Sequence, residues 1–314
     1  MAINAGEPVE LLTMLVKCPS VTPEEGGALA GLQGVLEALG FECTRLAFSD
    51  SDTPDAALDD GFLYGRGASD MKGGIACFIA ALKRFLDAKN GTFEGSISLL
   101  ITGDEEGPAV NGTVKVLKWM ADNNHTPDHC IVGEPTSIKN VGDMMKIGRR
   151  GSINAHLIVE GIQGHVAYPQ KARNPIDLLV KILDRLMLEK LDSGTEHFQP
   201  SNLEITSVDT GNPASNVIPA KTQARFNIRY NDTYDGNSIA NHITDICRGA
   251  AGSQAENIRL CFEVSGDSFL TEPDEFVASI SAAITAQTGL TPELSTGGGT
   301  SDARFVTHYC PVIE

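Results

Sequence analysis

Apolar residues recur at helical spacing over residues 8–17 and 24–39, which predicts two amphipathic helices at the start of the chain. Gly40 can end the second helix, and a strand is expected over residues 41–48. The same patterns predict further elements: a short strand over 61–67, a helix over 72–88, buried strands over 96–102 and 129–132, and a helix over 113–123. Strands that alternate with helices indicate an α/β fold with an open, mostly parallel sheet and helices on both faces.

The pattern changes after Gly151. Long alternating strands are expected over 152–161 and 217–230, with helices near 175–190 and 236–250, which is typical of an antiparallel α+β unit. From about residue 265 the first pattern returns, with a helix to about Gln287 and an apolar ending. The predicted domains are therefore a catalytic domain, residues 1–151 and 265–314, and an inserted α+β dimerisation or lid domain, residues 152–264.

Length and charge narrow the classes of protein that fit. A chain of 314 residues exceeds what one compact core usually supports. Its 24 basic and 41 acidic residues give a net charge of −17, which repels phosphate backbones, so no nucleic-acid partner is expected. We find no signal peptide and no apolar run of membrane-spanning length, which predicts a cytoplasmic protein without membrane contact. The seven scattered cysteines form no CxxC pair and are expected to be reduced.

Three turns with carboxylates follow three predicted strands of the first domain. They hold Asp70 in GRGASDMKGG, Glu105 and Glu106 in ITGDEEG, and Glu134 in IVGEPTS. The carboxyl ends of strands in such a sheet form its ligand site, and carboxylates gathered there must share protons or bind a cation. Taken singly, each acid could instead cap a helix, interact favourably with the dipole at a helix N-terminus, or be an ordinary charged residue in a loop. Taken together with the neighbouring glycines, they predict a divalent metal site.

Seven motifs occur in the order found in one group of enzymes: GRGASDMKGG, DEEG, GEPTS, GRRGS, GHVAYP, NVIP and GGGTSDARF. The chain thereby resembles the dinuclear zinc aminoacylase and carboxypeptidase family of metallopeptidases over nearly its whole length. The resemblance implies two zinc ions, for which Co or Mn could substitute. It makes Asp70 the bridging ligand, gives Glu106 to one zinc and Glu134 to the other, and makes Glu105 the general base.

The resemblance also assigns residues outside the three acidic turns. His165 in GHVAYP would reach the partner subunit's site in a homodimer and stabilise an oxyanion, although a structural histidine is the plainer alternative. The small-molecule substrate has several carboxylates, which Arg side chains bind bidentately. The implied substrate-binding residues are Arg149, Tyr168, Asn216, Arg229, Gly299 and Thr300. For Asn216, a turn before Val217 is nearly as good an interpretation.

The motif match implies removal of succinate from N-succinyl-L,L-diaminopimelate, in lysine and diaminopimelate biosynthesis. Two alternatives stay open. One is a related aminoacylase, acetylornithine deacetylase or dipeptidase, which spacing alone does not separate from the first activity. The other is a non-catalytic dimeric relative that keeps the fold and lacks the metal-binding histidines.

The sequence departs from the family at its histidine ligands. No His-x-Asp motif precedes GRGASDMKGG, where residues 49–60 are rich in Asp, and no second zinc-binding histidine follows GGGTSDARF. Carboxylates alone favour Mg²⁺ or Mn²⁺ over zinc. Either the protein has these residues in a stretch that this 314-residue sequence omits, or they are deleted from the protein. The first is favoured because a parallel sheet without an interior strand would leave backbone groups unpaired.

Overall fold

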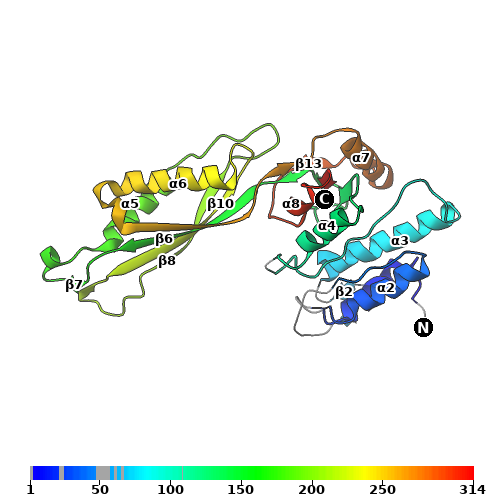
Figure 1. The fold of residues 1–314 in the computed structure, drawn as a ribbon, viewed down its shortest axis with the longest axis horizontal. Helices are drawn as coiled ribbons and strands as arrows, with labels where there is room; N and C mark the ends of the chain where they lie inside the picture. The colour runs from blue at the N-terminus through cyan, green and yellow to red at the C-terminus, as the bar shows by residue number, and fades with distance from the viewer. Residues whose placement is uncertain (1–2, 21–24, 47–56, 60–61, 65–66, 108) are drawn as a thin grey trace. The chain divides into compact units, whose positions relative to one another are not determined.

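The computed structural model describes residues 3–20, 25–46, 57–59, 62–64, 67–107 and 109–314. The chain divides into two compact units (Figure 1). The first comprises residues 1–145, 273–293 and 301–314, and the second comprises residues 146–272 and 294–300. Each unit is described by itself below.

The second unit is a four-stranded antiparallel sheet with two helices on one face. The strand order is β11-β6-β10-β8, which with the intervening helices gives a split β-α-β arrangement of the ferredoxin-like type. Its main elements are β6 (Gly151–Glu160), α5 (Pro175–Met187), β8 (Asn202–Asp209), β10 (Lys221–Tyr230), α6 (Gly236–Ala251) and β11 (Ile258–Gly266). Its smaller elements are β5 (Gly148–Arg149), β7 (Gly164–His165), η2 (Pro169–Lys171), β9 (Val217–Ile218), η3 (Gly252–Asn257) and β12 (Phe269–Leu270). The predicted strand over 217–230 is thus two strands, separated by Pro219 and Ala220.

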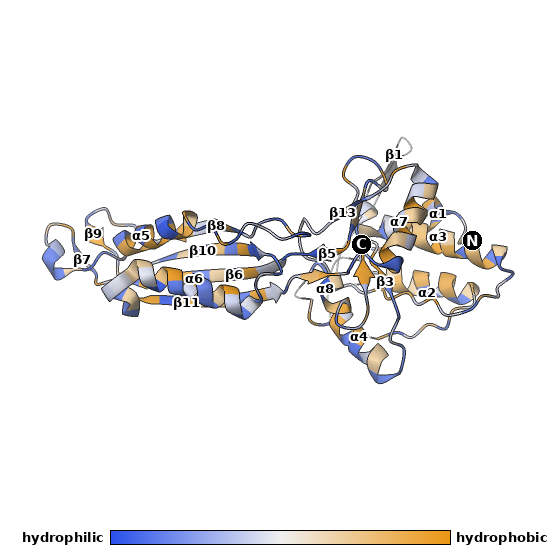
Figure 2. Cartoon of the chain, turned by 90° about the horizontal axis from the view of Figure 1, so that it is seen from above, coloured by the Kyte–Doolittle hydropathy of each residue, from blue (hydrophilic) through white to orange (hydrophobic). Residues whose placement is uncertain are grey.

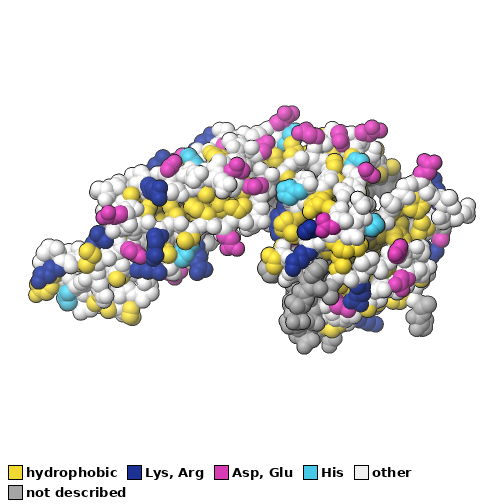
Figure 3. Space-filling view, viewed as in Figure 1, with side chains coloured by type: hydrophobic (Ala, Val, Ile, Leu, Met, Phe, Trp, Pro, Cys, Tyr) yellow, Lys and Arg dark blue, Asp and Glu magenta, His cyan; other side chains and the backbone are white. Residues whose placement is uncertain are grey.

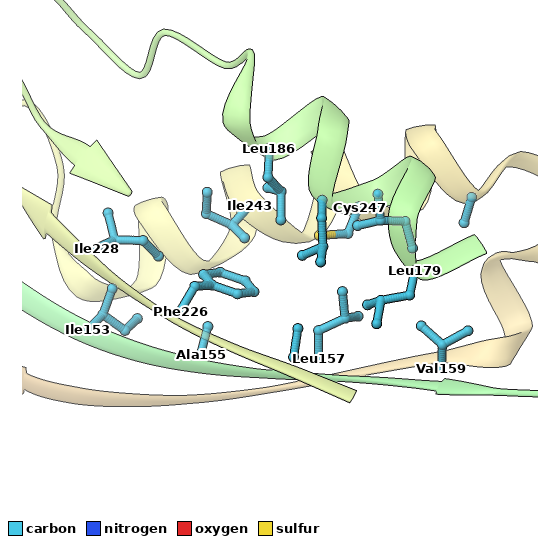
Figure 4. Close-up of a cluster of buried hydrophobic side chains, with 14 of the residues drawn as sticks. Ile153, Ala155, Leu157, Val159, Leu179, Leu186, Phe226, Ile228, Ile243 and Cys247 are labelled. Atoms are coloured by element: carbon cyan, nitrogen blue, oxygen red, sulfur yellow. The ribbon is translucent and has the colours of Figure 1, made fainter. Parts of the chain in front are cut away.

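The core of the second unit lies between the sheet and the two helices (Figure 4). Alternate residues of β6 point to this side, because side chains on a strand alternate between its faces. They meet Phe226 and Ile228 of β10 and apolar residues of α5 and α6. The fully buried members include Ile153, Leu157, Val159, Leu179, Ile182, Phe226, Ile228, Ile239, Ile243 and Cys247. In Figure 2, α5 and α6 each show hydrophobic and hydrophilic residues, in keeping with one face on the sheet and one in solvent.

Backbone pairing decides where the two units divide. Phe269 pairs with Arg149 and Leu270 with Gly148, while Ile147 donates its N–H to the Ser295 carbonyl at 3.0 Å. These bonds tie residues 146–149, 269–272 and 294–300 to the second unit. The sequence boundaries at 151/152 and 264/265 had put these segments in the first unit, because apolar patterning does not register which backbone groups pair.

The first unit is built mainly from helices around a second core. Leu11 and Leu15, from the first helix, pack with Leu32 and Leu36 from the second and Ile79 from the third. The helices are α1 (Pro8–Lys17), α2 (Ala28–Ala38), α3 (Gly73–Ala88), α4 (Thr113–Asp122), α7 (Glu275–Thr288) and α8 (Ala303–Val306), with η1 (Ala68–Lys72) before α3. The strands are β1 (Ala57–Asp59), β2 (Phe62–Tyr64), β3 (Cys130–Ile131) and β14 (Val312–Ile313). Two more, β4 (Met144–Lys146) and β13 (Glu293–Ser295), lie where the units divide. A search of the described helices found none with the length and hydropathy of a membrane span.

The parallel sheet of the first unit is much smaller than predicted. Among its described residues, β3 and β14 pair in parallel over only two residues, with Val312 opposite Cys130, and β4 pairs with β13 in another two-stranded ladder. The predicted buried strand over 96–102 forms no ladder, and Leu99, Leu100 and Ile101 are only half-buried. Ile131 in β3 is 49% exposed, so this strand is not buried as expected. Residues 41–46 form no strand, and 47–48 lie outside the described residues. An apolar run becomes a strand only where a neighbour pairs with its backbone.

We predict that Phe226→Ala lowers the free energy of unfolding of the second unit by about 3–5 kcal/mol, because Phe226 is 1% exposed at the centre of the core. The matched control is Arg225→Ala, one residue earlier on the exposed face, which should change stability by less than about 0.5 kcal/mol. Urea denaturation measures both variants. Equal losses would contradict the placement of the core on this face of the sheet.

Candidate functional site

The turn with Asp70 sits between a left-handed glycine and a long helix. Gly67 has φ +72°, a conformation that glycine adopts without steric cost, and its carbonyl accepts from the Lys72 N–H at 2.8 Å. The Asp70 side chain is exposed, and the Asp70–Met71 peptide bond is cis. The turn therefore presents the Asp70 carboxylate to solvent at the start of α3.

Close packing of glycines joins the Asp70 turn to the Glu134 turn. A Cβ atom on Gly74 would lie 2.8 Å from the Gly133 carbonyl oxygen, and one on Gly133 would lie 2.8 Å from the Met71 Cε. Glu134 directly follows Gly133 and is half-buried. The structure thus brings together two of the three predicted acidic turns through a contact that only glycine permits.

The C-terminal segment holds the strand that leads into Glu134. Val132 donates its N–H to the Ile313 carbonyl at 2.9 Å, and Cys130 donates to the Pro311 carbonyl at 2.9 Å. Val312 and Ile313 are fully buried. Residues far apart in the sequence therefore fix the position of this turn.

The third acidic turn, with Glu105 and Glu106, is a compact loop closed by its own side chains. Asp104 Oδ2 accepts from the backbone N–H groups of Val110 and Asn111 at 2.8 and 2.7 Å. Within the loop, Glu105 is half-buried and Glu106 is exposed. The two adjacent acids therefore occupy different environments.

Glu105 is the acid most perturbed by its surroundings. Its pKa is raised to about 6, first by burial and then by the negative charges of Asp302, Glu106 and Asp70, while the positive charge of Arg304 opposes the shift. All these residues belong to the first unit. A carboxylate with a pKa near neutrality can take up and return a proton at physiological pH. Asp302, which is buried, was not among the predicted site residues, although it lies within the GGGTSDARF motif.

The described residues do not fit a two-metal centre. Among them, no group of three or more His, Cys, Asp or Glu side chains is arranged to hold a metal ion. Asp70 and Glu106 are exposed, and no described histidine completes a metal-binding group with them. We therefore derive no chemical step through a metal from this arrangement.

In the second unit, the predicted Arg149, Gly299 and Thr300 lie together. Arg149 is 8% exposed, and its Nη1 donates to the Gly299 carbonyl at 3.0 Å. The same Nη1 would lie 2.9 Å from a Cβ on Gly298, whose φ is +100°. The buried guanidinium thus packs against the glycine-rich turn and donates a hydrogen bond to it.

Arg229 lies beside a second arginine that the sequence analysis did not select, Arg150. Burial lowers the pKa of both groups, and the positive charge of Arg229 lowers that of Arg150 as well. Arg229 Nη1 and Arg150 Nε are buried and have no hydrogen-bond partner among the described residues. The only sequence signal for Arg150 was its place in GRRGS, next to Arg149. Two adjacent guanidinium groups with free donors suit an anionic ligand.

His165, Tyr168 and Asn216 form a separate group. His165 pairs with Val217 across β7 and β9, and Val166 donates its N–H to the Asn216 carbonyl at 3.1 Å. The His165 and Tyr168 rings lie 5.9 Å apart between centroids, and both side chains are exposed. These three predicted residues therefore share one end of the second unit.

The group around His165 and the pair Arg150 and Arg229 lie at opposite ends of the sheet. Lys221, at the start of β10, pairs with Glu160 near the His165 end, whereas Arg229 pairs with Ser152 at the other end. Eight residues of antiparallel strand span roughly 27 Å. One copy of this unit therefore does not bring His165 and Arg229 to the same small ligand.

Comparison with known proteins places the chain in a family. Residues 147–254 match the model of a peptidase dimerisation domain. A relative from Rhodospirillum centenum, named succinyl-diaminopimelate desuccinylase, is 49% identical, and the match covers 99% of this chain and 89% of the relative. The chain belongs to the succinyl-diaminopimelate desuccinylase family.

Solved structures share its fold at low identity. The aminopeptidase PepT from Bacillus cereus has a TM-score of 0.77 and 19% identity, with 99% of this chain and 90% of that one covered. The YXEP protein of Bacillus subtilis, described as a dinuclear metal-binding peptidase of the M20 family, has a TM-score of 0.67 and 15% identity, with 98% and 87% covered. These likenesses confirm the predicted α/β fold class.

The alignment with one relative includes positions that this chain lacks. The match with the R. centenum relative runs over 348 positions, whereas 99% of this chain is about 311 residues. About 37 aligned positions therefore have no counterpart here. A gap of this size accords with the absence of a His-x-Asp motif and with the unpaired run at residues 96–102.

We predict that Gly74→Ala lowers the free energy of unfolding by more than about 1 kcal/mol, although alanine favours helices, because its Cβ would collide with the Gly133 carbonyl. Gly34→Ala is the matched control within α2, where no atom lies within 4 Å of the added Cβ. This control should gain up to about 1 kcal/mol. Thermal unfolding of both variants tests the contact, and a stabilised Gly74→Ala would refute it.

Proposed function

We propose that the chain is an amide hydrolase that releases succinate from N-succinyl-L,L-diaminopimelate, a step of lysine and diaminopimelate biosynthesis. The observation that carries this proposal is the 49% identity to a succinyl-diaminopimelate desuccinylase, spread over 99% of this chain. The match extends over both units. We place the activity in the cytoplasm.

Glu105 is the proton carrier of the proposed reaction. Its carboxylate lies in the partly buried loop that also holds Glu106, and its pKa of about 6 suits both uptake and release of a proton near neutral pH. Hydrolysis of an amide requires a base that takes a proton from water and an acid that gives one to the leaving amine. One carboxylate with this pKa can do both in turn.

Arg229 is the proposed contact for a substrate carboxylate, with Arg149, Gly299 and Thr300 shaping the same end of the second unit. The support is the buried Arg229 Nη1 without a hydrogen-bond partner among the described residues, next to Arg150. A guanidinium in that state gains most from a carboxylate that can take two of its hydrogen bonds. The acyl group and the amino-acid part of the substrate both supply carboxylates.

We infer that the enzyme acts as a homodimer, in which His165, Tyr168 and Asn216 serve the site of the partner subunit. The match of residues 147–254 to a peptidase dimerisation domain supports this arrangement. So does the span of roughly 27 Å along β10 between the two groups of predicted substrate residues. A second copy can supply the distant group, and His165 would then donate a hydrogen bond to the developing oxyanion.

The proposal that the enzyme depends on metal rests on its similarity to a dinuclear metal-binding peptidase, and not on the arrangement of the described side chains. Asp70, Glu106 and Glu134 are the residues that would bind two zinc ions, or Co or Mn in their place, without the family's histidines. Carboxylates alone bind zinc less well than mixed ligand sets do. Metal analysis of the purified chain measures how much of this capacity remains.

We predict that the chain hydrolyses N-succinyl-L,L-diaminopimelate faster than acetylornithine or simple dipeptides. Glu105→Gln should lower kcat by about two to four orders of magnitude, because glutamine keeps the shape but does not accept the proton. Its bound metal should stay at the level of the parent, whereas Glu106→Gln should lose metal. If acetylornithine or a dipeptide is the better substrate, the chain is a related aminoacylase or dipeptidase. An inactive parent would instead support the non-catalytic relative.

We predict that two inactive variants, Glu105→Gln and His165→Ala, restore activity when mixed under conditions that allow subunit exchange. Half of the dimers are then hybrids, and each hybrid has one site with both residues intact. Activity should return to about a quarter of the parent value. Mixing Glu105→Gln with His308→Ala, a change in the first unit, serves as a control for exchange. No recovery in the first mixture, or a monomer with full activity in sedimentation, would refute the shared site.

A further inference from the structure

We propose that Thr113 and Asp302 are positioning residues that join the two ends of a loop and so hold Glu105 in place. The described residues of this loop, 103–107 and 109–112, are called here the acidic loop. The proposal that this loop is ordered by the two side chains stands on geometry alone. Its catalytic meaning rests on the function proposed above for Glu105.

A chain of hydrogen bonds links three side chains around the acidic loop. Thr113 Oγ1 donates to Asp302 Oδ2 at 2.5 Å, and the hydroxyl oxygens of Thr102 and Thr113 lie 3.1 Å apart. A hydroxyl has one proton, and that of Thr113 goes to the carboxylate. Thr102 must therefore donate to Thr113, which fixes the direction of both bonds.

The two threonines flank the acidic loop, so the hydrogen bond between them holds its two ends together. Thr102 directly precedes the acidic loop and Thr113 directly follows it, at the first turn of α4. A Cβ on Gly112 would lie 3.5 Å from Thr102 Cβ and 3.1 Å from Asp104 Cβ, so the two ends of the loop are packed against each other. Glu105 lies between these ends.

Asp302 is a buried residue that accepts a hydrogen bond from Thr113 and, through it, is linked to Thr102. It is 7% exposed, and Thr113 is 4% exposed. Its carbonyl accepts from the Phe305 N–H at 2.9 Å at the start of α8, and its Oδ1 is 3.9 Å from Arg304 Nη2. The backbone after α8 returns to pair with β3, which leads into the Glu134 turn. Asp302 is therefore part of the same segment that fixes a second acidic turn.

The Asp302 carboxylate depends on the hydroxyl of Thr113 as its hydrogen-bond donor. Asp302 Oδ1 has no hydrogen-bond partner among the described residues, so the bond from Thr113 is the one good hydrogen bond found for this buried group. Burial raises the pKa of Asp302, and the bond from Thr113 lowers it, which means that the bond favours the charged form. A buried charge that loses its donor destabilises the arrangement around it. Removal of the Thr113 hydroxyl should therefore release the loop.

Amide hydrogen exchange of the metal-free chain tests the proposal without any activity. In Thr113→Val, which keeps the shape and removes the hydroxyl, amides of the acidic loop should exchange at least about tenfold faster than in the parent. Thr113→Ser keeps the hydroxyl and should restore the slow exchange. Thr102→Val removes only the outer bond and should give a smaller increase.

Thr285→Val is the matched control, because the one hydrogen bond found for its hydroxyl among the described residues goes to the Ser281 carbonyl within α7. It should leave exchange of the acidic loop unchanged. In the active enzyme, Thr113→Val should lower kcat with little change in KM, and Thr113→Ser should recover kcat. Unchanged loop exchange in both Thr113→Val and Thr102→Val would overturn the proposal, as would an equal increase over the whole first unit. If the parent has no activity, the function proposed above fails while the exchange experiment still decides the role of the two residues.

Discussion

Backbone hydrogen bonding between strands is the main constraint on both units. The second unit satisfies it across a whole sheet, whereas the first unit forms only short ladders. In the second unit, β6 and β10 each pair on both sides, so all four strands of the sheet are fixed in register. In the described part of the first unit, strands pair only in two-stranded ladders, such as the parallel pair β3 and β14. A strand that finds no partner leaves polar groups to water, so its apolar side chains cannot be fully buried. Residues 96–102 illustrate this outcome.

The second unit keeps His165 and Arg229 at opposite ends of one sheet, which is the structural basis of the shared site proposed above. Its sheet has a helical face that forms a dry core and another face on which polar side chains such as His156 and Gln223 hydrogen-bond to each other. On the visible face of this unit in Figure 3, acidic and basic side chains are interspersed. The excess negative charge of the chain is therefore not gathered into one patch there. Arg150 and Arg229 are a local concentration of positive charge within this unit.

The first unit uses its C-terminal segment to organise acids that are distant in sequence. Residues 301–314 contribute Asp302 to the acidic loop and β14 to the strand before Glu134. Ser301 and Glu314 hydrogen-bond to each other within the same buried segment. Close glycine packing at Gly74 and Gly133 adds the Asp70 turn. Three acidic turns thus depend on a few contacts between elements, each of which is short and specific.

The sequence determined much of this protein by itself. Apolar spacing correctly predicted α1, α3, α4, α5 and α6 to within a few residues, because a helix is stabilised within its own segment. The ordered motifs predicted the family, since they mark turns whose residue types the local backbone requires.

Only the tertiary structure decided which predicted strands formed, where the units divide and which acids share an environment. It placed Asp302 beside Thr113 and Arg150 beside Arg229. It also put His165 and Arg229 at opposite ends of one sheet. These outcomes depend on pairing and packing between residues far apart in the chain, and a pattern along one segment contains no information about its partner.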